Sequence, residues 1–398
     1  MRVCIDASNL SRGGGVTHLV ELLRHADAAA MGIERVFVWA PAATLARLED
    51  RPWLAKRTEP ALEQHFLRRA VWQRYRLGPL ASADGCDVLF VPGGSFATSF
   101  RPVVTMSRNL LPFETRELAR YGISRLALKF LALRWTQARS YRAADGTLFL
   151  TRHARDVVTA RTGTLPGLTA LVPHGVDERF LHAPRPARAL EDCTPEQPLR
   201  LVYVSIIDVY KHQHHVASAA ALLRERGLPV QLELVGPAYG PALARLERTL
   251  AEVDPQRHAV HWAGPLPHDD LPALYAQADI AVFASSCENM PNILLEMMAS
   301  GLPIACSNRG PMPEVLGDGV YFDPERPEDI AAAVERLARS PALREHMAAA
   351  AHRRAGQFDW RRCATDTFEF LHEVVRRHRG QPAPATVPPR PPAADALP

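Results

Sequence analysis

The chain has 398 residues, enough for two or three domains that each bury a core of their own. Hydrophobic residues make up 47% of it and charged residues 23%, which excludes a disordered, fibrous or multi-span membrane protein. The formal net charge of +4 does not indicate a general nucleic-acid binder. The six cysteines form no C-x-x-C pair and no signal-like apolar segment opens the sequence, so we expect a cytoplasmic protein.

Strands and helices alternate in the N-terminal half. The apolar residues 3–5 lead through Gly13, Gly14 and Gly15 into a helix that begins near Val16. This alternation favours a parallel sheet covered by helices. Further strands are expected at 35–40, 87–92, 103–107 and 147–151.

Residues 183–198 are rich in proline and show neither the helical nor the strand period, so we interpret them as a connection between two domains. After them the alternation restarts, which favours a second doubly wound domain. Strands are expected at 199–206, 230–235, 260–262, 280–284 and 303–306, and helices at 214–226, 242–253, 271–278, 291–300, 328–339 and 342–354.

The glycine loop is the first candidate binding element. Backbone N–H groups without side chains can approach an anion at a helix N-terminus, where the helix dipole favours negative charge. The dinucleotide pattern G-x-G-x-x-G does not fit, because His18 stands where its last glycine would be. Gly14 and Gly15 are therefore candidates for phosphate or sugar contact, with a simple tight turn as the alternative.

Two glutamates follow the strand 280–284. Glu288 lies in the loop that leaves this strand, and Glu296 lies in the helix that follows. Both are thus expected near the carboxyl edge of a sheet, where open α/β folds bind ligands. Glu296 stands among leucines and methionines, so its carboxylate needs a partner, and the two hydroxyls of a ribose would supply one. The alternative is a pair of solvated glutamates on a helix face.

The helix that carries Glu296 has clear end signals. Pro291 is suited to its first position, and Gly301 is suited to its C-terminal end. The N–H groups of Asn292 and Ile293 fall in the first turn, where they can hold a phosphate.

Lysine is rare in this chain, which contains only Lys56, Lys129 and Lys211. Lys211 follows the first strand of the second domain, at the carboxyl edge of the expected sheet. This position makes it a candidate phosphate clamp, with an exposed surface lysine as the alternative.

Together these motifs resemble family 4 of the retaining glycosyltransferases. Glu288 and Glu296 match the E-x7-E signature of that family and are followed by M-x-A-x-G-x-P. The resemblance covers about residues 1–375 and implies the α/β GT-B fold, in which two Rossmann-like doubly wound domains face an interdomain cleft. The glycine loop, Lys211, the turn 173–177, the stretch 262–279 and the segment 310–314 (GPMPE) follow in the order of the family.

The resemblance also implies the domain boundaries. We expect an N-terminal acceptor-binding domain over residues 1–185, a linker over 186–198 and a nucleotide-sugar-binding domain over 199–357. A helix over 358–379 would return to the first domain, and a disordered tail would occupy 380–398.

Roles for individual residues follow from the same resemblance. Glu288 would contact the 3- and 4-hydroxyls of the donor sugar, Glu296 the ribose, and Lys211 the diphosphate, while Gly14 and Gly15 would contact phosphate and sugar from across the cleft. No cofactor and no metal are expected, because Lys211 and helix N–H groups would neutralise the departing charge and no D-x-D pair is present. No protein nucleophile is assigned, so the catalytic residues are Glu288 and Lys211.

The sequence departs from the family pattern at two places. Ile206 stands where the family has an arginine, a contact for which Arg309 is a candidate replacement. Arg108 and Asn109 stand where the family has a His-Asp pair, which puts any histidine-dependent role there in doubt. His174 lines the cleft in the resemblance, whereas from its sequence context alone it is a turn residue.

Three histidines, His212, His214 and His215, stand close together in the sequence. Neighbouring histidines in one helical turn point in different directions, and no carboxylate or cysteine completes a ligand set. We therefore expect a solvated helix start without a metal.

Residues 65–142 concentrate positive charge, with 13 Lys and Arg against 4 Asp and Glu. Aromatic and aliphatic residues alternate with the basic ones, among them Phe66, Tyr75, Phe130 and Trp135. Such a surface can rest on anionic lipid headgroups, which would suggest an acceptor attached to a lipid. The alternative is a set of arginines that solvate ordinary core-facing helices.

The sequence thus predicts a metal-independent retaining glycosyltransferase that uses a nucleotide-diphosphate sugar. The acceptor would be a glycan or lipid-linked molecule in bacterial surface polysaccharide or glycolipid synthesis, and the enzyme would be cytoplasmic and peripheral at the inner face of the membrane. Two alternatives remain, a catalytically silent sugar-nucleotide-binding subunit and a non-hydrolysing nucleotide-sugar epimerase. Transfer of the sugar to an acceptor without isomerisation of the donor would distinguish a glycosyltransferase from both of these alternatives.

Overall fold

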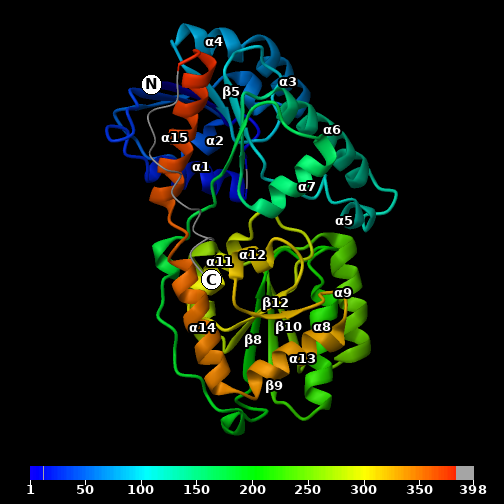
Figure 1. Cartoon of the computed structure of the whole chain (residues 1–398). Helices are drawn as coiled ribbons and strands as arrows, with labels where there is room; N and C mark the ends of the chain where they lie inside the picture. The colour runs from blue at the N-terminus through cyan, green and yellow to red at the C-terminus, as the bar shows by residue number, and fades with distance from the viewer. Residues whose placement is uncertain (12, 382–398) are drawn as a thin grey trace. The chain divides into compact units, whose positions relative to one another are not determined.

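The computed structural model describes residues 1–11 and 13–381, which form two compact units (Figure 1). Among the described residues, unit 1 contains Met1–Leu118, Ile123–Gly175 and 359–381, and unit 2 contains Ala119–Gly122 and Val176–Phe358. Of the expected disordered tail, residues 382–398 lie outside the described part of the chain.

Seven parallel strands form the sheet of unit 1, in the order β3-β2-β1-β4-β5-β6-β7. The central strands are almost entirely buried and mostly apolar, as expected of a parallel sheet with helices on both faces. The strands are β1 (Arg2–Asp6), β2 (Arg35–Trp39), β3 (Leu54–Arg57), β4 (Val88–Val91), β5 (Val103–Met106), β6 (Gly146–Phe149) and β7 (Leu168–Leu171). The helices are α1 (Gly14–Arg24), α2 (Ala42–Leu45), α3 (Phe66–Tyr75), α4 (Leu77–Ala83), α5 (Thr115–Ala119), α6 (Arg125–Ala143), α7 (Arg152–Thr162) and α15 (Trp360–His378).

Six parallel strands form the sheet of unit 2, in the order β10-β9-β8-β11-β12-β13. The strands are β8 (Leu199–Val204), β9 (Val230–Val235), β10 (Val260–Gly264), β11 (Ile280–Phe283), β12 (Ile304–Ser307) and β13 (Val320–Phe322). The helices are α8 (Gln213–Glu225), α9 (Gly240–Val253), α10 (Leu271–Gln277), α11 (Asn292–Ala299), α12 (Met312–Leu316), α13 (Pro327–Ala338) and α14 (Pro341–Ala355).

Both sheets have the doubly wound strand order, so the prediction of two Rossmann-like domains is confirmed. In each sheet the chain first adds strands on one side and then on the other. The order reverses between β1 and β4 in unit 1 and between β8 and β11 in unit 2. The loops that leave these strands therefore diverge at the carboxyl edge of each sheet, which is where open α/β folds generally bind ligands.

The chain enters unit 2 earlier than expected. The boundary lies between Gly175 and Val176, not after residue 185. Val176 donates its N–H to the carbonyl of Phe358 over 3.0 Å, and His182 donates its N–H to the carbonyl of Ala299 over 3.0 Å. The expected linker 186–198 also contacts unit 2, since Ala187 donates its N–H to Glu345 Oε1 over 2.9 Å. These bonds attach the whole segment 176–198 to unit 2.

Helix α15 packs on α1, β4 and β6 of unit 1. A glycine in the sheet permits this close approach, because a Cβ at Gly146 would lie 2.7 Å from Cγ2 of Val374 and 2.9 Å from Phe370. Asp359 caps the helix by accepting the N–H groups of Arg361 and Arg362. No helix of the described residues has the length and apolarity needed to cross a bilayer.

Candidate active site

Lys211 and Glu288 lie at the switch point of unit 2, on the loops after β8 and β11. The Lys211 ammonium donates to Glu288 Oε1, and the two side chains are only 8% and 16% exposed. Lys211 Nζ also lies 5.5 Å from the ring centroid of Phe283 on β11. A surface position for Lys211 is therefore wrong. Each of these charges compensates the desolvation of the other.

Backbone contacts hold the two loops together beneath this ion pair. The Tyr203 hydroxyl on β8 donates to the carbonyl of Lys211 over 2.9 Å. Ser286 donates its N–H to the carbonyl of Tyr210 over 2.9 Å. The loop that carries Lys211 is thus fixed both to its own strand and to the loop that carries Glu288.

Glu296 is buried on α11, which contradicts a solvated position for this carboxylate. Its Oε1 accepts a hydrogen bond from His268 Nε2 over 2.8 Å. Its Oε2 is buried and has no partner among the described residues. Burial raises the pKa of Glu296, while the hydrogen bond from His268 opposes this shift. The buried hydroxyl of Tyr275 has no partner among the described residues either, and burial beside Glu296 raises the pKa of Tyr275.

His268 was missed by the sequence analysis. It lies on a short 3-10 helix, His268–Asp270, and packs 5.3 Å from the ring of Phe180. Arg179 contacts both His268 Nδ1 and Asp269. Since a guanidinium can only donate, Nδ1 accepts and Nε2 carries the proton that is donated to Glu296. Nothing in the local sequence around His268 marks this role, because the contact joins residues 28 positions apart.

The N-terminus of α11 begins one residue later than expected, with Pro291 as the residue before the helix. The first bond of the helix runs from the Leu295 N–H to the Pro291 carbonyl over 3.2 Å. The N–H groups of Asn292 and Ile293 therefore precede this bond, as expected for an anion-binding turn. Gly301 ends the helix at a φ of +65°, and a Cβ there would lie 2.7 Å from the backbone nitrogen of Pro184.

Unit 1 presents its glycine loop at the start of α1. Gly13 has a φ of +69°, and the first bonds of the helix run from Val16 and Thr17 to the Gly13 carbonyl. The N–H groups of Gly14 and Gly15 thus precede the hydrogen-bond ladder. Arg108, from the loop after β5, lies against this turn, because its Nη1 is 3.0 Å from the position of a Cβ on Gly15.

Arg108 is a half-buried cation without an ionic partner among the described residues. Its Nε and Nη1 are buried and have no hydrogen-bond partner there. Burial lowers the pKa of Arg108 to about 10, so the guanidinium stays protonated at neutral pH. Its neighbour Asn109 is occupied in a turn, where its Oδ1 accepts the N–H of Leu111 over 3.2 Å.

His174 is buried in unit 1, where its ring stacks on Trp360 at 5.4 Å between centroids. The ring of His18 on α1 lies 4.8 Å from that of His174. Burial, and then the proximity of His174 and Arg108, lowers the pKa of His18, which keeps its imidazole neutral. The structure therefore brings His174 together with the glycine loop region of unit 1.

Arg309 follows β12 in unit 2 and is engaged in a salt bridge. Its Nη2 lies 2.9 Å from both carboxylate oxygens of Asp323. Ile206, at the place of the family arginine, is 38% exposed and supplies no hydrogen-bond donor from its side chain. The role of Arg309 as a diphosphate contact remains a prediction, and Asp323 would have to share its guanidinium.

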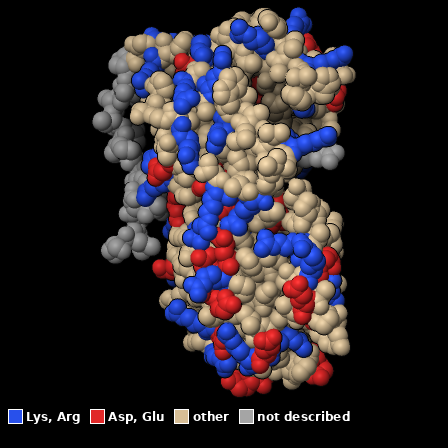
Figure 2. All heavy atoms as spheres, turned by 90° about the vertical axis from the view of Figure 1, so that its right-hand side faces the viewer, with Lys and Arg blue, Asp and Glu red and all other residues tan. Residues whose placement is uncertain are grey.

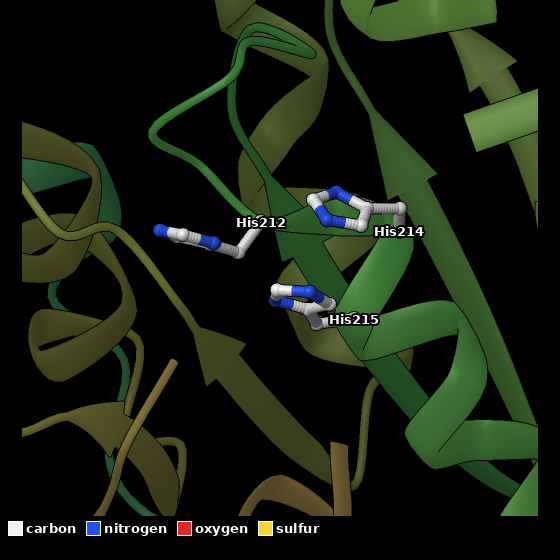
Figure 3. A group of neighbouring side chains, drawn as sticks. All are labelled: His212, His214 and His215. Carbon is white, nitrogen blue, oxygen red and sulfur yellow. The ribbon is translucent and has the colours of Figure 1, made fainter. Parts of the chain in front are cut away.

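The histidines at the start of α8 are buried, so the expected solvated helix start is wrong (Figure 3). His212 is 0% exposed and His214 is 8% exposed, while His215 is half-buried. Burial lowers the pKa of His212 and of His214 to about 2, and it also lowers the pKa of His215. One nitrogen from each ring lies within 4.8 Å of the others, so among the described residues these three side chains form a group that could hold a metal.

Comparison with known proteins shows which family and which fold the chain resembles. Residues 192–354 match the family model described as "Glycosyl transferases group 1". The O-antigen chain mannosyltransferase B of Escherichia coli is 37% identical over 109 residues, which are 27% of this chain and 29% of that protein. The chain spans about half the length, or less, of the first curated relatives that it matches.

Solved structures extend the similarity to the whole fold. Sucrose-phosphate synthase from Thermosynechococcus elongatus matches with a TM-score of 0.72 at 18% identity, over 95% of this chain and all of that one. HepE from Anabaena, in complex with UDP and glucose, matches with a TM-score of 0.67 at 18% identity, over 94% of this chain and all of that one. The chain therefore has the GT-B fold, and its resemblance to group 1 glycosyl transferases is confirmed by the family model over residues 192–354.

Proposed function

We propose that the chain is a retaining glycosyltransferase that moves a sugar from a nucleotide-diphosphate donor to a glycan or lipid-linked acceptor. One observation carries the proposal. The buried Lys211–Glu288 pair and the unpartnered Oε2 of Glu296 lie on loops and a helix at the switch point of unit 2. A cation, an anion and a hydrogen-bond acceptor at such a switch point match the diphosphate, the sugar and the ribose of a nucleotide sugar.

The diphosphate would bind to Lys211 and to the first N–H groups of α11. Phosphate oxygens bring more negative charge than Glu288, so they would take over the Lys211 ammonium. The carboxylate of Glu288 would then be released to accept hydrogen bonds from the sugar hydroxyls. The ion pair thus keeps both groups charged and positioned before the donor binds.

The ribose would bind to Glu296. A buried carboxylate oxygen without a partner is unfavourable, because it has lost water and gained no hydrogen bond. Ribose hydroxyls would remove this cost by donating to Oε2, while His268 holds Oε1. This part of the site would therefore recognise the nucleoside and not the transferred sugar.

The reaction would break the bond between the anomeric carbon and the diphosphate oxygen, and the acceptor hydroxyl would attack on the same face of the sugar. The departing oxygen gains negative charge, which Lys211 and the N-terminus of α11 would neutralise without a metal. No side chain is assigned as a nucleophile. HepE, whose structure holds UDP and glucose, supports this donor class. The O-antigen chain mannosyltransferase supports a role in bacterial surface polysaccharide synthesis.

Unit 1 would hold an anionic part of a substrate. The guanidinium of Arg108, the N–H groups of Gly14 and Gly15, and the start of α1 all favour negative charge. A carboxylate or phosphate there would supply the ionic partner for Arg108 that the described residues do not. This proposal assigns to Arg108 a binding role in place of the histidine of the family pattern.

The acceptor would be reached at a membrane surface. The apolar side chains Phe66, Leu67, Val71 and Tyr75 of α3 and Leu128, Leu131 and Trp135 of α6 are exposed, and we name them together the apolar surface of unit 1. In α3 the spacing of Leu67, Val71 and Tyr75 places them on one side of the helix. Exposed basic residues, Arg68, Arg125, Lys129 and Arg139, lie on the same two helices.

The two helices flank one loop. Arg74 of α3 donates to the Ala97 carbonyl over 3.5 Å, and Ser140 of α6 accepts the Phe96 N–H over 3.0 Å. Figure 2 shows many Lys and Arg side chains and fewer Asp and Glu side chains on a mostly uncharged surface in the part that unit 1 forms. Apolar side chains that insert among headgroups, ringed by cations that attract anionic lipid, suit a peripheral position at the inner face of the cytoplasmic membrane.

The function is tested by incubating the purified protein with labelled sugar nucleotides and candidate glycan and lipid-linked acceptors. We expect transfer to an acceptor with the anomeric configuration of the donor retained, in buffer that contains a chelator. Calorimetric titration with UDP and GDP would identify the base. Release of an isomerised donor, or donor binding without transfer to any acceptor, would contradict the proposal.

A further inference from the structure

The histidines at the start of α8 are arranged in a way that the proposed sugar transfer does not use. His214 and His215 project from the first turn of α8, and His212 projects from the segment before the helix (Figure 3). Their rings are close, with centroids 3.9 Å apart for His214 and His215 and 5.3 Å apart for His212 and His215.

Hydrogen bonds fix which nitrogen of His212 and of His215 carries the proton. The Ser286 hydroxyl donates to the Tyr210 carbonyl over 3.1 Å, so its oxygen acts as the acceptor for His212 Nε2 over 2.9 Å. His215 Nδ1 lies 2.9 Å from the Pro324 carbonyl, which can only accept. His212 Nδ1 and His215 Nε2 are therefore left with their lone pairs.

Two of the ring nitrogens, His212 Nδ1 and His214 Nε2, are buried without a hydrogen-bond partner among the described residues. Three neutral imidazoles that each keep a lone pair within a shared space form a set of metal ligands. Ligating histidines almost always donate their other N–H to an oxygen, as His212 and His215 do here.

His212 lies before α8 with an unusual backbone, and in Figure 3 its ring is directed away from the helix that carries His214 and His215. His212 is one of two non-glycine residues with a left-handed backbone in the described part of the chain, with a φ of 55°. This conformation turns its side chain out of the direction that a helical residue would give it. A non-glycine residue in such a conformation costs free energy and is common at functional sites.

We propose that His212, His214 and His215 bind one divalent transition-metal ion, for which we take Zn²⁺ as the test ion. Imidazole nitrogens suit Zn²⁺, and water would complete a four-coordinate site. Zinc–nitrogen bonds of about 2.0–2.1 Å in a tetrahedral site place the nitrogens about 3.3 Å apart. The rings would therefore rotate inward from their present spacing of up to 4.8 Å, which costs neither His212 Nδ1 nor His214 Nε2 a hydrogen bond.

Two arginines lie near the site, and the charge of one of them is compensated. Arg120, which lies near the histidines, is paired with Glu325 over 2.9 Å, so its charge is compensated. Arg245 on α9 is the other nearby cation. The ion would join the loop after β8, the loop after β11 through Ser286 and the loop after β13 through Pro324. Its role would be to fix the segment that carries Lys211, and its binding does not depend on the proposed function.

The test uses the full chain without a histidine tag, treated with a chelator and dialysed. Zn²⁺ is titrated by calorimetry, and Co²⁺ is titrated by visible absorption, which reports four-coordinate geometry. We expect one equivalent of each ion to bind. In the variant His214→Gln we expect an affinity at least 100-fold lower, with an unchanged circular dichroism spectrum.

Two further variants make the test specific. His261 is an exposed histidine on β10 of the same unit, and His261→Gln should bind Zn²⁺ as the unchanged chain does. Ser286→Ala removes the acceptor for His212 Nε2 but leaves all three ligands, and we expect affinity to fall about 10–100-fold. Absence of one-to-one binding, wild-type affinity in His214→Gln, or an equal loss in His261→Gln would overturn the proposal. If His214→Gln does not fold, wild-type affinity in Ser286→Ala overturns it.

Discussion

His268 donates its Nε2 proton to Oε1 of Glu296 over 2.8 Å, and the second oxygen of this buried carboxylate has no partner among the described residues. The asymmetry separates two functions within one side chain. Oε1 is used to orient the carboxylate, while Oε2 remains for a ligand.

Replacing Glu296 with alanine is expected to weaken nucleotide binding. The change removes hydrogen bonds between a charged acceptor and ribose hydroxyls, each worth about 1.5–3 kcal/mol. The dissociation constant should rise about 10–100-fold, since about 1.4 kcal/mol corresponds to a factor of ten. Calorimetric titration with the nucleotide measures this dissociation constant. Glu247→Ala, at an exposed carboxylate on α9 that pairs with Arg257, is the control. Unchanged affinity in Glu296→Ala would count against the ribose contact.

Glu296→Gln is expected to stabilise the protein when no nucleotide is bound. Burial raises the folded-state pKa of Glu296 above its ordinary value of 4.5, so ionisation favours the unfolded state. Stability is therefore lost as the pH rises from the unfolded-state pKa through the folded-state pKa. The glutamine keeps an acceptor for His268 and carries no charge. Its melting temperature should exceed that of the wild type at pH 7.5, and the difference should disappear near pH 4. A difference that is equal at both pH values would contradict this explanation.

Glu288→Ala is expected to lower turnover more than donor binding. The carboxylate would contact the transferred sugar, whereas most of the binding contacts involve the nucleotide and the diphosphate. A fall of about 10²–10³ in kcat is expected, the range seen when one group that stabilises a transition state is removed. Steady-state kinetics separate kcat from KM.

Glu288→Gln is the matched variant for this prediction. It keeps an acceptor for Lys211, while Glu288→Ala leaves a buried ammonium unpaired, a loss that costs about 3–5 kcal/mol. Melting temperatures of both variants with saturating nucleotide show whether lost turnover reflects lost folding. Normal kcat in both folded variants would remove Glu288 from the catalytic residues.

Most of the fold could be predicted from the sequence, because the central strands are mostly apolar segments that are buried in the sheets. The strands β3 and β7 were missed, since both lie at sheet edges and are not fully buried. The strand β3 reads Leu-Ala-Lys-Arg, which shows neither the apolar run nor the alternation of a typical strand. The strand β13 was missed because it has only three residues.

The site was predictable where its residues are neighbours in sequence. Glu288 and Glu296 occupy one loop and helix, so their spacing carried the information. His268 and Arg179 reach Glu296 through tertiary packing of separate segments, which no local pattern records. The histidine group was misjudged for another reason. A helical backbone over all three residues would point the side chains in different directions, whereas His212 is left-handed and lies outside α8.

Arg108→Met is expected to change the stability of unit 1 and its binding of substrate in opposite directions. Because the pKa of Arg108 is lowered to about 10 by burial, its charge destabilises the folded state at neutral pH. Methionine retains most of the side-chain volume without that charge, so the melting temperature should rise while kcat/KM falls at least about 10-fold, which corresponds to about 1.4 kcal/mol. Arg47→Met, at an exposed arginine, is the control. Unchanged kcat/KM in the Arg108 variant would exclude a substrate contact.

The apolar surface of unit 1 predicts salt-sensitive binding to anionic vesicles. Phe66 and Trp135, both 67% exposed, would insert among headgroups, and the basic residues on the same helices would attract anionic lipid. The double variant Phe66→Ser and Trp135→Ser should lose at least about tenfold in vesicle affinity, because exposed apolar area contributes about 25 cal/mol per Å² when it is buried. Its turnover on a water-soluble acceptor should not change.

Vesicle flotation with phosphatidylglycerol and phosphatidylcholine membranes distinguishes insertion from electrostatic attraction. Binding to phosphatidylglycerol should weaken as salt is raised, because exposed charges are screened over a Debye length of about 8 Å at physiological ionic strength. Phosphatidylcholine vesicles should bind weakly at every salt concentration. Leu266→Ser, at an exposed leucine of unit 2, should bind vesicles normally. Equal binding to both lipids, or no loss in the double variant, would show that this surface solvates core-facing helices and does not contact a membrane.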